Sequence, residues 1–389
     1  MIQRSLQASK NRSFFLFGPR QAGKSTYVKT LLAAEDMYIT LLPQRIFLNY
    51  IRDPNLFRQE VLFHKKKHEK FTCIVDEIQK IPALLDEVHD LIETEGIRFI
   101  LTGSSARKLK RGAANLLAGR ASTYHMYSCT YEELGENFDL ERALRLGCLP
   151  YLWSDPLNES DQKEFLESYA EIYLREEIQA EGVIRNIAPF IRFIDVAANN
   201  DGEVVNYSNI ARECGVSVKT VQEYYQILED TFLAYRIDPW IKSVRKRLVS
   251  HPRYYLFDTG VTNTLCHYYS TLNSVVRGRR FEQFITLQLI ALNDYHKLGF
   301  EYFFWRSNTG IEVDLILTCA QQPIAAIEIK SSPEITNKDA RALLEFQAEY
   351  PDVKLYILAP IERPRLLSSK VHVLPWQLFF SEELPKLNR

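Results

Sequence analysis

The sequence predicts an α/β protein built from more than one packed unit, and three observations support this class. With 389 residues the chain is longer than one ordinary domain, which favours two or three units. From residue 13 to about 130, short apolar runs alternate with helical patterns, as they do in βα units around a mainly parallel sheet. From about residue 278 a second mixed pattern follows, in the order helix, strand, strand, helix, strand.

The overall composition is that of a globular protein, with 46% hydrophobic and 25% charged residues. The formal net charge is -1, so any binding to nucleic acid or to an anionic membrane must be local. The six cysteines show no CxxC pair or metal-type spacing, which indicates reduced thiols and argues against zinc. Because we find neither a signal-type apolar segment nor an apolar run of about 18 residues, we expect a cytoplasmic protein without a membrane partner.

Four apolar runs are predicted to be strands of the first unit: Phe14–Phe17, Tyr38–Leu42, Thr72–Val75 and Phe99–Leu101. Each run is followed by turn or polar residues. In open α/β sheets the ligands bind at the carboxyl edge of the strands, which is where these residues would lie. The sequence therefore predicts a ligand site at this edge.

A phosphate-binding motif follows the first of these strands. The segment Gly18-Pro-Arg-Gln-Ala-Gly-Lys-Ser25 fits the pattern G-x-x-x-x-G-K-S/T and precedes the helical run Thr26–Leu32. Its backbone N–H groups are expected to converge on phosphate oxygens at the N-terminus of that helix. Lys24 is predicted to reach the β- and γ-phosphates of ATP, and Ser25 to bind Mg²⁺. The predicted nucleotide-binding residues are Gly18, Pro19, Arg20, Gln21, Ala22, Gly23, Lys24, Ser25 and Thr26.

Two acidic residues end the strand that begins at Thr72. Asp76 is predicted to hold Mg²⁺, directly or through water, and Glu77 to orient and polarise the attacking water. The alternative is that these acids are the N-cap of a helix over Leu84–Ile92. After the next strand, Ser104 is predicted to sense the γ-phosphate, with a helix cap formed by Ser104 or Ser105 as the alternative.

Several motifs resemble those of the AAA-type ATPases of bacteria and archaea that carry the domain of unknown function DUF4143 at their C-terminus. The resemblance spans nearly the whole chain. It departs from the family at Gly147-Cys-Leu-Pro-Tyr151, where a second glycine usually follows the first and an acid follows the proline. The motifs are Leu101-Thr-Gly-Ser-Ser-Ala106, Leu117-Ala-Gly-Arg120, Tyr173-Leu-Arg-Glu-Glu177, Tyr255-Leu-Phe-Asp-Thr-Gly260, Gly278-Arg-Arg-Phe-Glu282, Glu312-Val-Asp314 and Ile327-Glu-Ile-Lys330.

The resemblance also implies a role for an arginine. Arg120 is predicted to meet the γ-phosphate, in cis or from a neighbouring subunit of a homo-oligomer, because a planar guanidinium suits developing phosphoryl charge. Arg107 is the competing candidate. The alternative for Arg120 is a surface ion pair.

The segment from Tyr207 to Leu228 predicts a helix-turn-helix. Gly215 would make the turn and Ser217 would cap the second helix. The predicted shared core is Ile210, Ala211, Val216, Val221 and Leu228. The second helix presents a mixed face, with Lys219, Thr220, Gln222 and Glu223, while the basic run Lys242–Arg247 would lie in the wing of a winged helix. Contact with DNA and a purely structural docking role both remain open.

Four residues near the C-terminus follow the order of a PD-(D/E)xK nuclease. Glu282 lies on an amphipathic helix, Asp314 begins an apolar strand, and Glu328 and Lys330 end the next one. Asp314 and Glu328 would hold a divalent metal, Glu282 would complete its shell, and Lys330 would position the nucleophile. Acids at strand ends are otherwise usually solvated edges.

We therefore expect an AAA-like P-loop ATPase domain over residues 1–135, a helical lid or linker over 136–200, a winged helix-turn-helix over 201–258 and a restriction-endonuclease-like α/β domain over 259–389. The expected function is hydrolysis of ATP with Mg²⁺, coupled to a C-terminal module for which DNA is a candidate partner. Two alternatives stay open. One is a metal-dependent DNA nuclease or DNA-binding protein that uses ATP as a switch, and the other is a nucleotide-gated protein-interaction scaffold.

Overall fold

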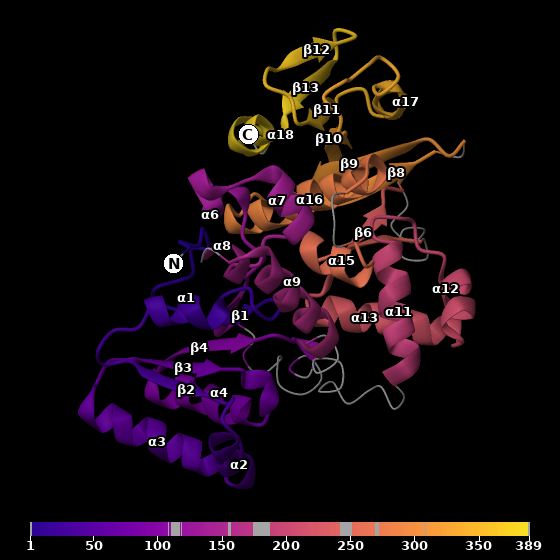
Figure 1. Ribbon diagram of the computed structural model, residues 1–389. Coiled ribbons are helices and arrows are strands. Elements are labelled where there is room, and N and C mark those ends of the chain that lie inside the picture. Colours follow the sequence, from indigo (N-terminus) through magenta and orange to yellow (C-terminus); the bar gives the residue numbers. More distant parts are fainter. Residues whose placement is uncertain are drawn as a thin grey trace.

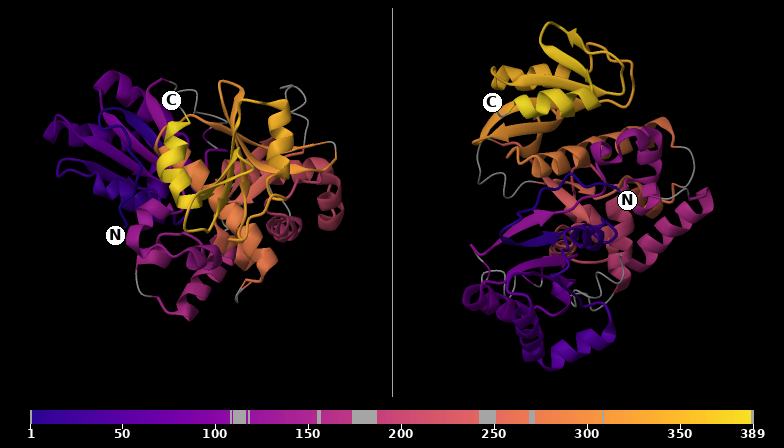
Figure 2. Two further views of the ribbon diagram at one scale, coloured as in Figure 1. Left: turned by 90° about the horizontal axis from the view of Figure 1, so that it is seen from above. Right: turned by 90° about the vertical axis from the view of Figure 1, so that its left-hand side faces the viewer.

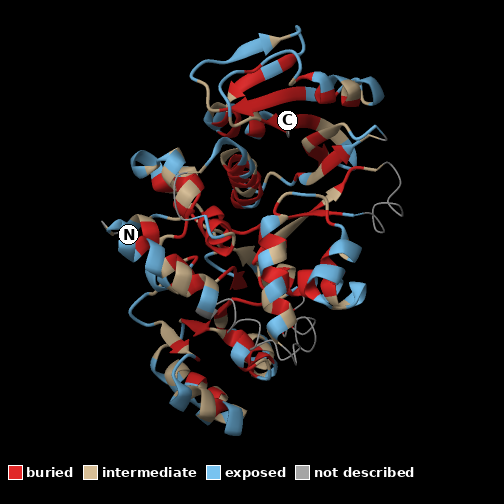
Figure 3. Ribbon diagram, turned by 45° about the vertical axis from the view of Figure 1, so that its right-hand side comes forward, coloured by how far each residue is buried: buried red, intermediate tan, exposed pale blue. Residues whose placement is uncertain are grey.

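The computed structural model describes residues 2–107, 109, 117, 119–154, 157–173, 187–241, 251–268, 272–307 and 309–387. Two β-sheets lie at opposite ends of the molecule, with helices between them (Figure 1). No helix in the described part of the chain is both long enough and apolar enough to cross a membrane. Buried positions line the sheets and the inward faces of the helices, while the outer helices are striped with exposed residues (Figure 3).

The first sheet is parallel throughout, and its strand order is β2-β3-β4-β1-β5. The four predicted strands are present, although β2 ends at Thr40 and not at Leu42. The fifth strand, β5, was not predicted and pairs with β1 along its whole length. The strands are β1 (Ser13–Phe17), β2 (Met37–Thr40), β3 (Thr72–Asp76), β4 (Arg98–Gly103) and β5 (Ala121–His125).

Alternation along β1 assigns the two faces of this sheet to different partners. Phe15 and Phe17 join a core with α3 and α4, whereas Phe14 and Leu16 pack with α1 on the opposite face. Since both faces are covered, β1, β3 and β4 are largely apolar runs, as expected for parallel strands, while the edge strands β2 and β5 are only partly buried. The helices of this unit are α1 (Lys24–Thr30), α2 (Gln44–Arg52), α3 (Pro54–Lys67) and α4 (Leu84–Glu95).

The second sheet is mixed, and its order is β12-β13-β11-β10-β9-β8-β6-β7. The β6–β7 hairpin joins it through two residue pairs between β6 and β8, Asp238 with Phe303 and Pro239 with Phe304. The C-terminal pattern expected from the sequence lacked β8, β12 and β13. The strands are β6 (Ala234–Pro239), β7 (Arg253–Leu256), β8 (Glu301–Arg306), β9 (Glu312–Cys319), β10 (Gln322–Ile329), β11 (Lys354–Ala359), β12 (Arg365–Leu367) and β13 (Val371–Pro375).

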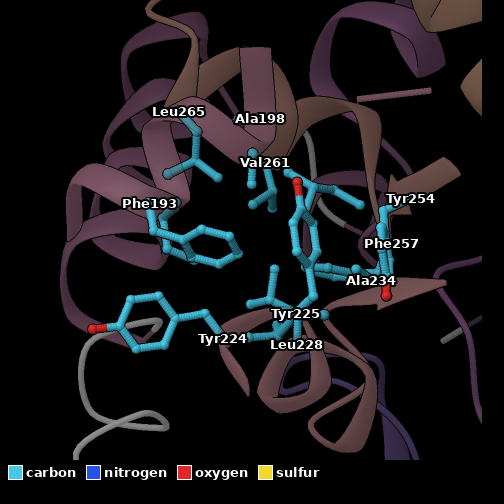
Figure 4. Close-up of a cluster of buried hydrophobic side chains, with 14 of the residues drawn as sticks. Phe193, Ala198, Tyr224, Tyr225, Leu228, Ala234, Tyr254, Phe257, Val261 and Leu265 are labelled. Atoms are coloured by element: carbon cyan, nitrogen blue, oxygen red, sulfur yellow. The ribbon is translucent and has the colours of Figure 1, made fainter. Parts of the chain in front are cut away.

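A helical region lies between the sheets, and Figure 4 shows part of its buried core around Phe193, Tyr225 and Val261. Within the expected helical lid or linker, α9 stops at Ser168 and a π-helical turn over Tyr169–Tyr173 follows it. Residues 174–179 lie outside the described residues. The helices are α6 (Tyr131–Leu134), α7 (Leu140–Leu146), α8 (Tyr151–Ser154), α9 (Glu159–Ser168), α11 (Ile187–Asn199), α12 (Tyr207–Cys214), α13 (Val218–Asp230) and α15 (Thr259–Leu265).

Helix α16 (Ser274–Tyr295) connects the two ends of the molecule, and Figure 2 shows it between them in a second orientation. Phe281 and Phe284 pack in the core beneath the second sheet, beside α7. Near its other end, Ala291 and Tyr295 join Phe14 and the apolar face of α1. One helix is therefore shared by the cores of both sheets. The remaining helices of the C-terminal region are α17 (Arg341–Glu349) and α18 (Trp376–Leu378).

The structure gives a role to the turn that departs from the family pattern. Asp258 is buried and caps α15, accepting hydrogen bonds from the backbone N–H groups of Gly260 and Val261, and it also accepts one from Cys148 at 2.7 Å. A Cβ atom at Gly147 would lie 1.8 Å from the Asp258 carboxylate, and the Gly147 φ of 78° favours glycine as well. This turn therefore holds α7 against α15.

Candidate functional site

The predicted phosphate-binding loop lies at the carboxyl edge of the first sheet, between β1 and α1. Gly18 approaches the strand beside it so closely that a Cβ atom would lie 2.1 Å from the carbonyl oxygen of Met126. Gly23 has a φ of 93° and lies at the start of α1. Lys24 is buried, and its ammonium group donates to the carbonyl oxygens of Gly18 and Pro19, both at 2.8 Å. The lysine is thus held over the loop.

Asp76 lies buried at the end of β3 and gathers three hydroxyl groups. Ser25 Oγ donates to its Oδ1 at 3.0 Å, and Tyr38 donates to its Oδ2 at 2.7 Å. Thr102, at the end of β4, also donates to Oδ1. Burial and the hydrogen bond to Asp76 raise the pKa of Tyr38, which therefore remains a donor at neutral pH. Tyr38 and Thr102 were missed by the sequence interpretation.

The Ser25 hydroxyl and the Asp76 carboxylate supply oxygen donors at one point, which is the ligand chemistry that Mg²⁺ prefers. The residues present therefore fit this metal. They come from the phosphate-binding loop and from the neighbouring strand end, so a metal held here would lie beside a nucleotide phosphate.

Glu77 follows β3 in a left-handed conformation, with a φ of 67°. Its backbone N–H donates to Thr102 Oγ1 at 3.2 Å. The Gln79 side-chain amide bridges two of the predicted catalytic residues, donating to the Glu77 carboxylate and, at 2.9 Å, to Ser104 Oγ. Gln79 was not predicted; its position in the short helix after Asp76-Glu77 was the available signal.

The alternative cap assignments have different outcomes. Helix α4 does begin at Leu84, but its N-cap residue is Ala83, without a side-chain hydrogen bond. The interpretation of Asp76 and Glu77 as the cap of this helix is therefore wrong, since a separate 3₁₀ turn over Ile78–Lys80 follows them first. Ser105 accepts a hydrogen bond from the backbone N–H of Arg107 at 3.2 Å, whereas Ser104 is engaged by Gln79.

The two candidate arginines differ in their surroundings. Arg120 forms an ion pair with Glu93 on α4, and both side chains are substantially exposed. This is the surface pair that the sequence interpretation left as the alternative. Arg107 is buried, and its Nη1 has no hydrogen-bond partner within the described residues. Neither arginine has a described contact with Lys24, Asp76 or Glu77.

Arg4, in the N-terminal segment, forms hydrogen bonds that link the phosphate-binding loop to other parts of the chain. Arg4 Nη1 donates to the carbonyl oxygen of Ala22 at 2.5 Å, and Nη2 donates to the Tyr127 carbonyl at 2.7 Å and to Tyr295 Oη at 3.0 Å. Its Nε pairs with buried Glu133 at 3.0 Å. Because Tyr295 belongs to α16, this one guanidinium links the loop to the helix shared by both sheets.

The predicted helix, turn and helix are present as α12 and α13. Gly215 has a φ of 68°, and Ser217 Oγ accepts from Thr220 N at 3.1 Å. Four of the five predicted core residues are buried, and Val216 packs against them half-buried. The basic run Lys242–Arg247 lies outside the described residues, and so does most of the family motif Tyr173–Glu177.

The carboxyl end of α13 contacts the segment after β4 that contains the predicted sensor Ser104, and we call this the sensor segment. The backbone N–H of Ala106 donates to the Asp230 carbonyl at 3.0 Å, and Phe232 stacks on Phe17 with ring centroids 5.8 Å apart. Lys219, Gln222 and Glu223 are exposed, while Thr220 is partly covered. The carboxyl end of α13 therefore makes contacts within the chain, and the exposed residues lie nearer its other end.

The four residues of the predicted nuclease-like site lie close together. Lys330 Nζ donates to Glu328 Oε1 at 2.5 Å, and Asp314 Oδ2 accepts from the backbone N–H of Ile329 at 2.8 Å. Burial, and then the charge of Asp314, raise the pKa of Glu282 to about 7 and that of Glu328 to about 8. Burial lowers the pKa of Lys330, but the carboxylates of Glu328 and Asp314 outweigh this effect and raise it.

Arg253, on β7, was missed by the sequence interpretation and contacts this cluster. Its Nη1 lies 3.5 Å from Glu282 Oε1 and 4.0 Å from Asp314 Oδ1, and its Nη2 pairs with Glu312. Tyr255 also donates to Glu282 Oε1, at 2.7 Å. Within the described ranges, no three His, Cys, Asp or Glu side chains are arranged to hold a metal ion.

The fold and the loop geometry define the first unit as a P-loop NTPase of the α/β class. Family models agree: residues 10–135 match the AAA domain, residues 277–379 match the domain of unknown function DUF4143, and residues 137–272 between them match the domain of unknown function DUF8612. The chain therefore has an AAA-type P-loop domain at its N-terminus and a DUF4143 domain at its C-terminus.

The chain is also similar in sequence to proteins of other organisms and aligns with two solved structures. An uncharacterized protein of Mycobacterium tuberculosis is 26% identical over 367 residues, covering 92% of this chain and 79% of the relative. An uncharacterized protein of Methanocaldococcus jannaschii is 23% identical, covering 63% of this chain and 61% of the relative. A structure of Drosophila ORC bound to AT-rich DNA and Cdc6 aligns at 10% identity and a TM-score of 0.23, covering 67% of this chain and 87% of that chain. Can2 from Sulfobacillus thermosulfidooxidans aligns at 9% identity and a TM-score of 0.21, covering 91% of this chain and 99% of that chain. Alignments at such TM-scores do not establish a common overall fold.

Proposed function

We propose that the protein binds and hydrolyses ATP with Mg²⁺ and that its nucleotide state is communicated to the C-terminal domain. The observation that carries this proposal is the contact between Ser25 and Asp76, which joins the phosphate-binding loop to the acidic end of β3. In P-loop NTPases a hydroxyl and a carboxylate in these positions hold the metal beside the nucleotide. The match of residues 10–135 to the AAA domain supports the same assignment.

In this proposal the loop residues from Gly18 to Thr26 bind the phosphates of ATP, mainly through backbone N–H groups at the start of α1. Lys24 exchanges its contacts with the Gly18 and Pro19 carbonyls for the β- and γ-phosphate oxygens. Mg²⁺ held by Ser25 and Asp76 would neutralise charge on the same oxygens. Tyr38 and Thr102 fix the orientation of the Asp76 carboxylate.

Glu77 is the proposed base that orients and polarises the attacking water. Gln79 holds its carboxylate and the Ser104 hydroxyl together, so the base and the sensor share one amide group. The Ser104 hydroxyl accepts from Gln79, so its own proton is available to a γ-phosphate oxygen. We propose that this contact holds Gln79, and through it Glu77, in position when ATP is bound. The left-handed backbone conformation of Glu77, with a φ of 67°, sets the direction in which its side chain leaves the end of β3.

Two contacts carry the nucleotide state outward in this proposal. Arg4 connects the Ala22 carbonyl with Tyr295 on α16, and Ala106 connects the sensor segment with the end of α13. The second contact favours a docking role for the proposed winged helix, because the Asp230 carbonyl at the end of α13 and Phe232 just after it both contact the first unit. The division into four segments at residues 135, 200 and 258 remains part of this proposal, since α15 and β6–β7 each contact more than one of them.

Phosphate release by the purified full chain, with and without DNA, tests the proposal. Lys24→Ala should abolish tight ATP binding, because it removes the charge that faces the β- and γ-phosphates. Glu77→Gln should keep ATP bound while turnover falls by orders of magnitude, since it keeps the shape of the side chain and removes the base. Equal nucleotide affinity in Lys24→Ala and wild type contradicts the assignment of the loop. Unchanged turnover in Glu77→Gln assigns the base elsewhere.

A further inference from the structure

The C-terminal domain contains a group of acidic side chains whose charges need compensation. Glu282 on α16, Asp314 on β9 and Glu328 on β10 converge, and we call these three residues the carboxylate cluster. The side chains of Asp314 and Glu328 are 15% and 9% exposed, so water reaches them poorly. Buried carboxylates persist only when cations or hydrogen-bond donors lie against them. In a metal-dependent nuclease a divalent ion does this.

Here an arginine from a different part of the chain lies against the cluster. Arg253 belongs to β7, in the region matched by the DUF8612 model and not in the DUF4143 match. Its side chain is 6% exposed, and its Nη1 faces both Glu282 and Asp314. The guanidinium also lies over the Phe304 ring, 4.6 Å from the centroid. These contacts fix the cation in one place, from several sides.

The other donors at the cluster also come from the protein. Lys330 pairs with Glu328, and the Ile329 N–H donates to Asp314. The Tyr255 hydroxyl donates to Glu282. Glu328 Oε2 is buried and has no hydrogen-bond partner within the described residues, but the acidic side chains of these ranges are not arranged to give Mg²⁺ or Mn²⁺ the multidentate shell that it requires. The arrangement therefore does not fit a divalent metal centre.

We propose that Arg253 is the resident cation of the carboxylate cluster, in the place that a divalent metal takes in a nuclease of this residue order. The cluster then serves as a docking site for the β6–β7 hairpin, and it ties the middle region of the chain to the C-terminal domain. Strand pairing supports this docking role of the hairpin, because β6 also extends the second sheet by pairing with β8. This inference concerns the DUF4143 domain and is independent of ATP hydrolysis.

The proposal predicts that removing the guanidinium creates a metal site. The full chain carrying Asp76→Asn is the background for the test, since this change removes the proposed metal ligand at the nucleotide site. In that background Arg253→Met, which keeps an apolar stem beside Phe304, should gain a Mn²⁺ site detected by loss of the free Mn²⁺ signal in electron paramagnetic resonance. Adding Asp314→Asn should remove the new site. Arg253→Lys keeps the charge and should gain nothing.

A matched control uses a neighbouring arginine. Arg306 pairs with Glu312 at 3.1 Å and is half exposed, but it has no described contact with the carboxylate cluster. Arg306→Gln should therefore bind no more Mn²⁺ than the background protein. A gain equal to that of Arg253→Met would show that general loss of positive charge, and not vacancy of the Arg253 position, attracts the ion, and it would overturn the proposal.

If Arg253→Met fails to fold, Mn²⁺ binding and DNA nicking by the background protein still test the proposal. The proposal expects that Asp314→Asn leaves its Mn²⁺ binding unchanged and that supercoiled DNA with Mn²⁺ is not nicked in an Asp314-dependent way. Mn²⁺ binding or nicking that disappears with Asp314→Asn overturns the proposal and restores a metal centre. A folded Arg253→Met protein that binds no additional Mn²⁺ also overturns it, because the arginine then does not occupy the metal position.

Discussion

Replacing Arg4 with alanine should loosen the phosphate-binding loop and weaken its connection to α16. The guanidinium donates to Ala22, Tyr127, Tyr295 and Glu133, and its side chain is 6% exposed while that of Glu133 is 0% exposed. Breaking a buried ion pair by removing one partner costs about 3–5 kcal/mol. Glu133 keeps the donors Ser5 N and Thr130 N, so we expect the lower end, about 3 kcal/mol.

Native-state hydrogen exchange of the full chain measures this effect where it arises. About 3 kcal/mol corresponds to roughly 100-fold faster exchange of amides that open together with the loop. The accelerated amides should include those around Ala22 and Tyr127, whose carbonyls lose their donor. Amides in α17, whose buried side chains pack in the core cluster around Ile316, Leu355 and Val373, serve as the internal control.

A second variant separates the buried charge from the other contacts. Glu133→Gln removes the negative charge and retains a side chain that can complete the capping box of α6 with Thr130. Arg4→Ala combined with Glu133→Gln should therefore be less destabilised than the sum of the two single variants. Exchange that is unchanged at Ala22 and Tyr127 in Arg4→Ala would refute the reasoning, and so would strict additivity of the two variants.

Four further predictions follow from the described contacts. Gln79→Ala should alter ATP turnover while ATP affinity, measured by titration calorimetry, stays near that of wild type, because Gln79 touches Glu77 and Ser104 but not the loop; equal turnover would contradict the bridging role. If Arg120 acts across subunits, Arg120→Ala mixed with Lys24→Ala should recover part of the phosphate-release rate, whereas no recovery at any ratio favours the ion pair with Glu93. Gly147→Ala should lower the melting temperature far more than Gly299→Ala, since a Cβ at Gly147 meets Asp258 and one at Gly299 meets nothing, although both have positive φ; equal shifts would contradict this. Burial raises the pKa of Asp201 from 3.8 to about 7, so the folded protein binds this proton more tightly than the unfolded chain does. The contribution of Asp201 to the free energy of unfolding therefore falls as the pH rises from about 4 to about 7. Urea titrations at several pH values should show that Asp201→Asn flattens this part of the pH profile.

The sequence was sufficient for β1, β3 and β4 of the first sheet because these strands are buried on both faces, whereas the partly exposed edge strand β5 was not predicted. Phe14–Phe17 and Thr72–Val75 are continuous apolar runs, each followed by polar residues with a recognisable spacing. The contact between Ser25 and Asp76 follows from the same spacing. Tyr38 and Thr102 could not be predicted, because their contacts with Asp76 depend on the neighbouring positions of β2, β3 and β4.

The second sheet was less accessible to sequence reasoning. Its strand β8 is a short run of aromatic residues, Tyr302 to Trp305, that periodicity alone does not assign to strand or helix. Glu282, Asp314, Glu328 and Lys330, which the sequence singled out by their order, lie close together in the structure. The position of Arg253 depends on a hairpin that joins the sheet out of sequence order, so no local pattern indicates that it lies against the acids.

The positions of Arg4 and Arg253 indicate how one chain can join three family regions into one molecule. Arg4 lies outside the AAA match and ties the phosphate-binding loop to α16, while Arg253 ties the middle region to acids on α16 and β9. Both arginines are buried, so each interface depends on a guanidinium whose loss removes the cation that faces its carboxylates. Because α16 is a single helix of 22 residues, a displacement at its Tyr295 end is transmitted to Glu282 unless the helix bends. In the proposed coupling, a change at the phosphate-binding loop that reaches Tyr295 through Arg4 would therefore also act on the contact between Glu282 and Arg253.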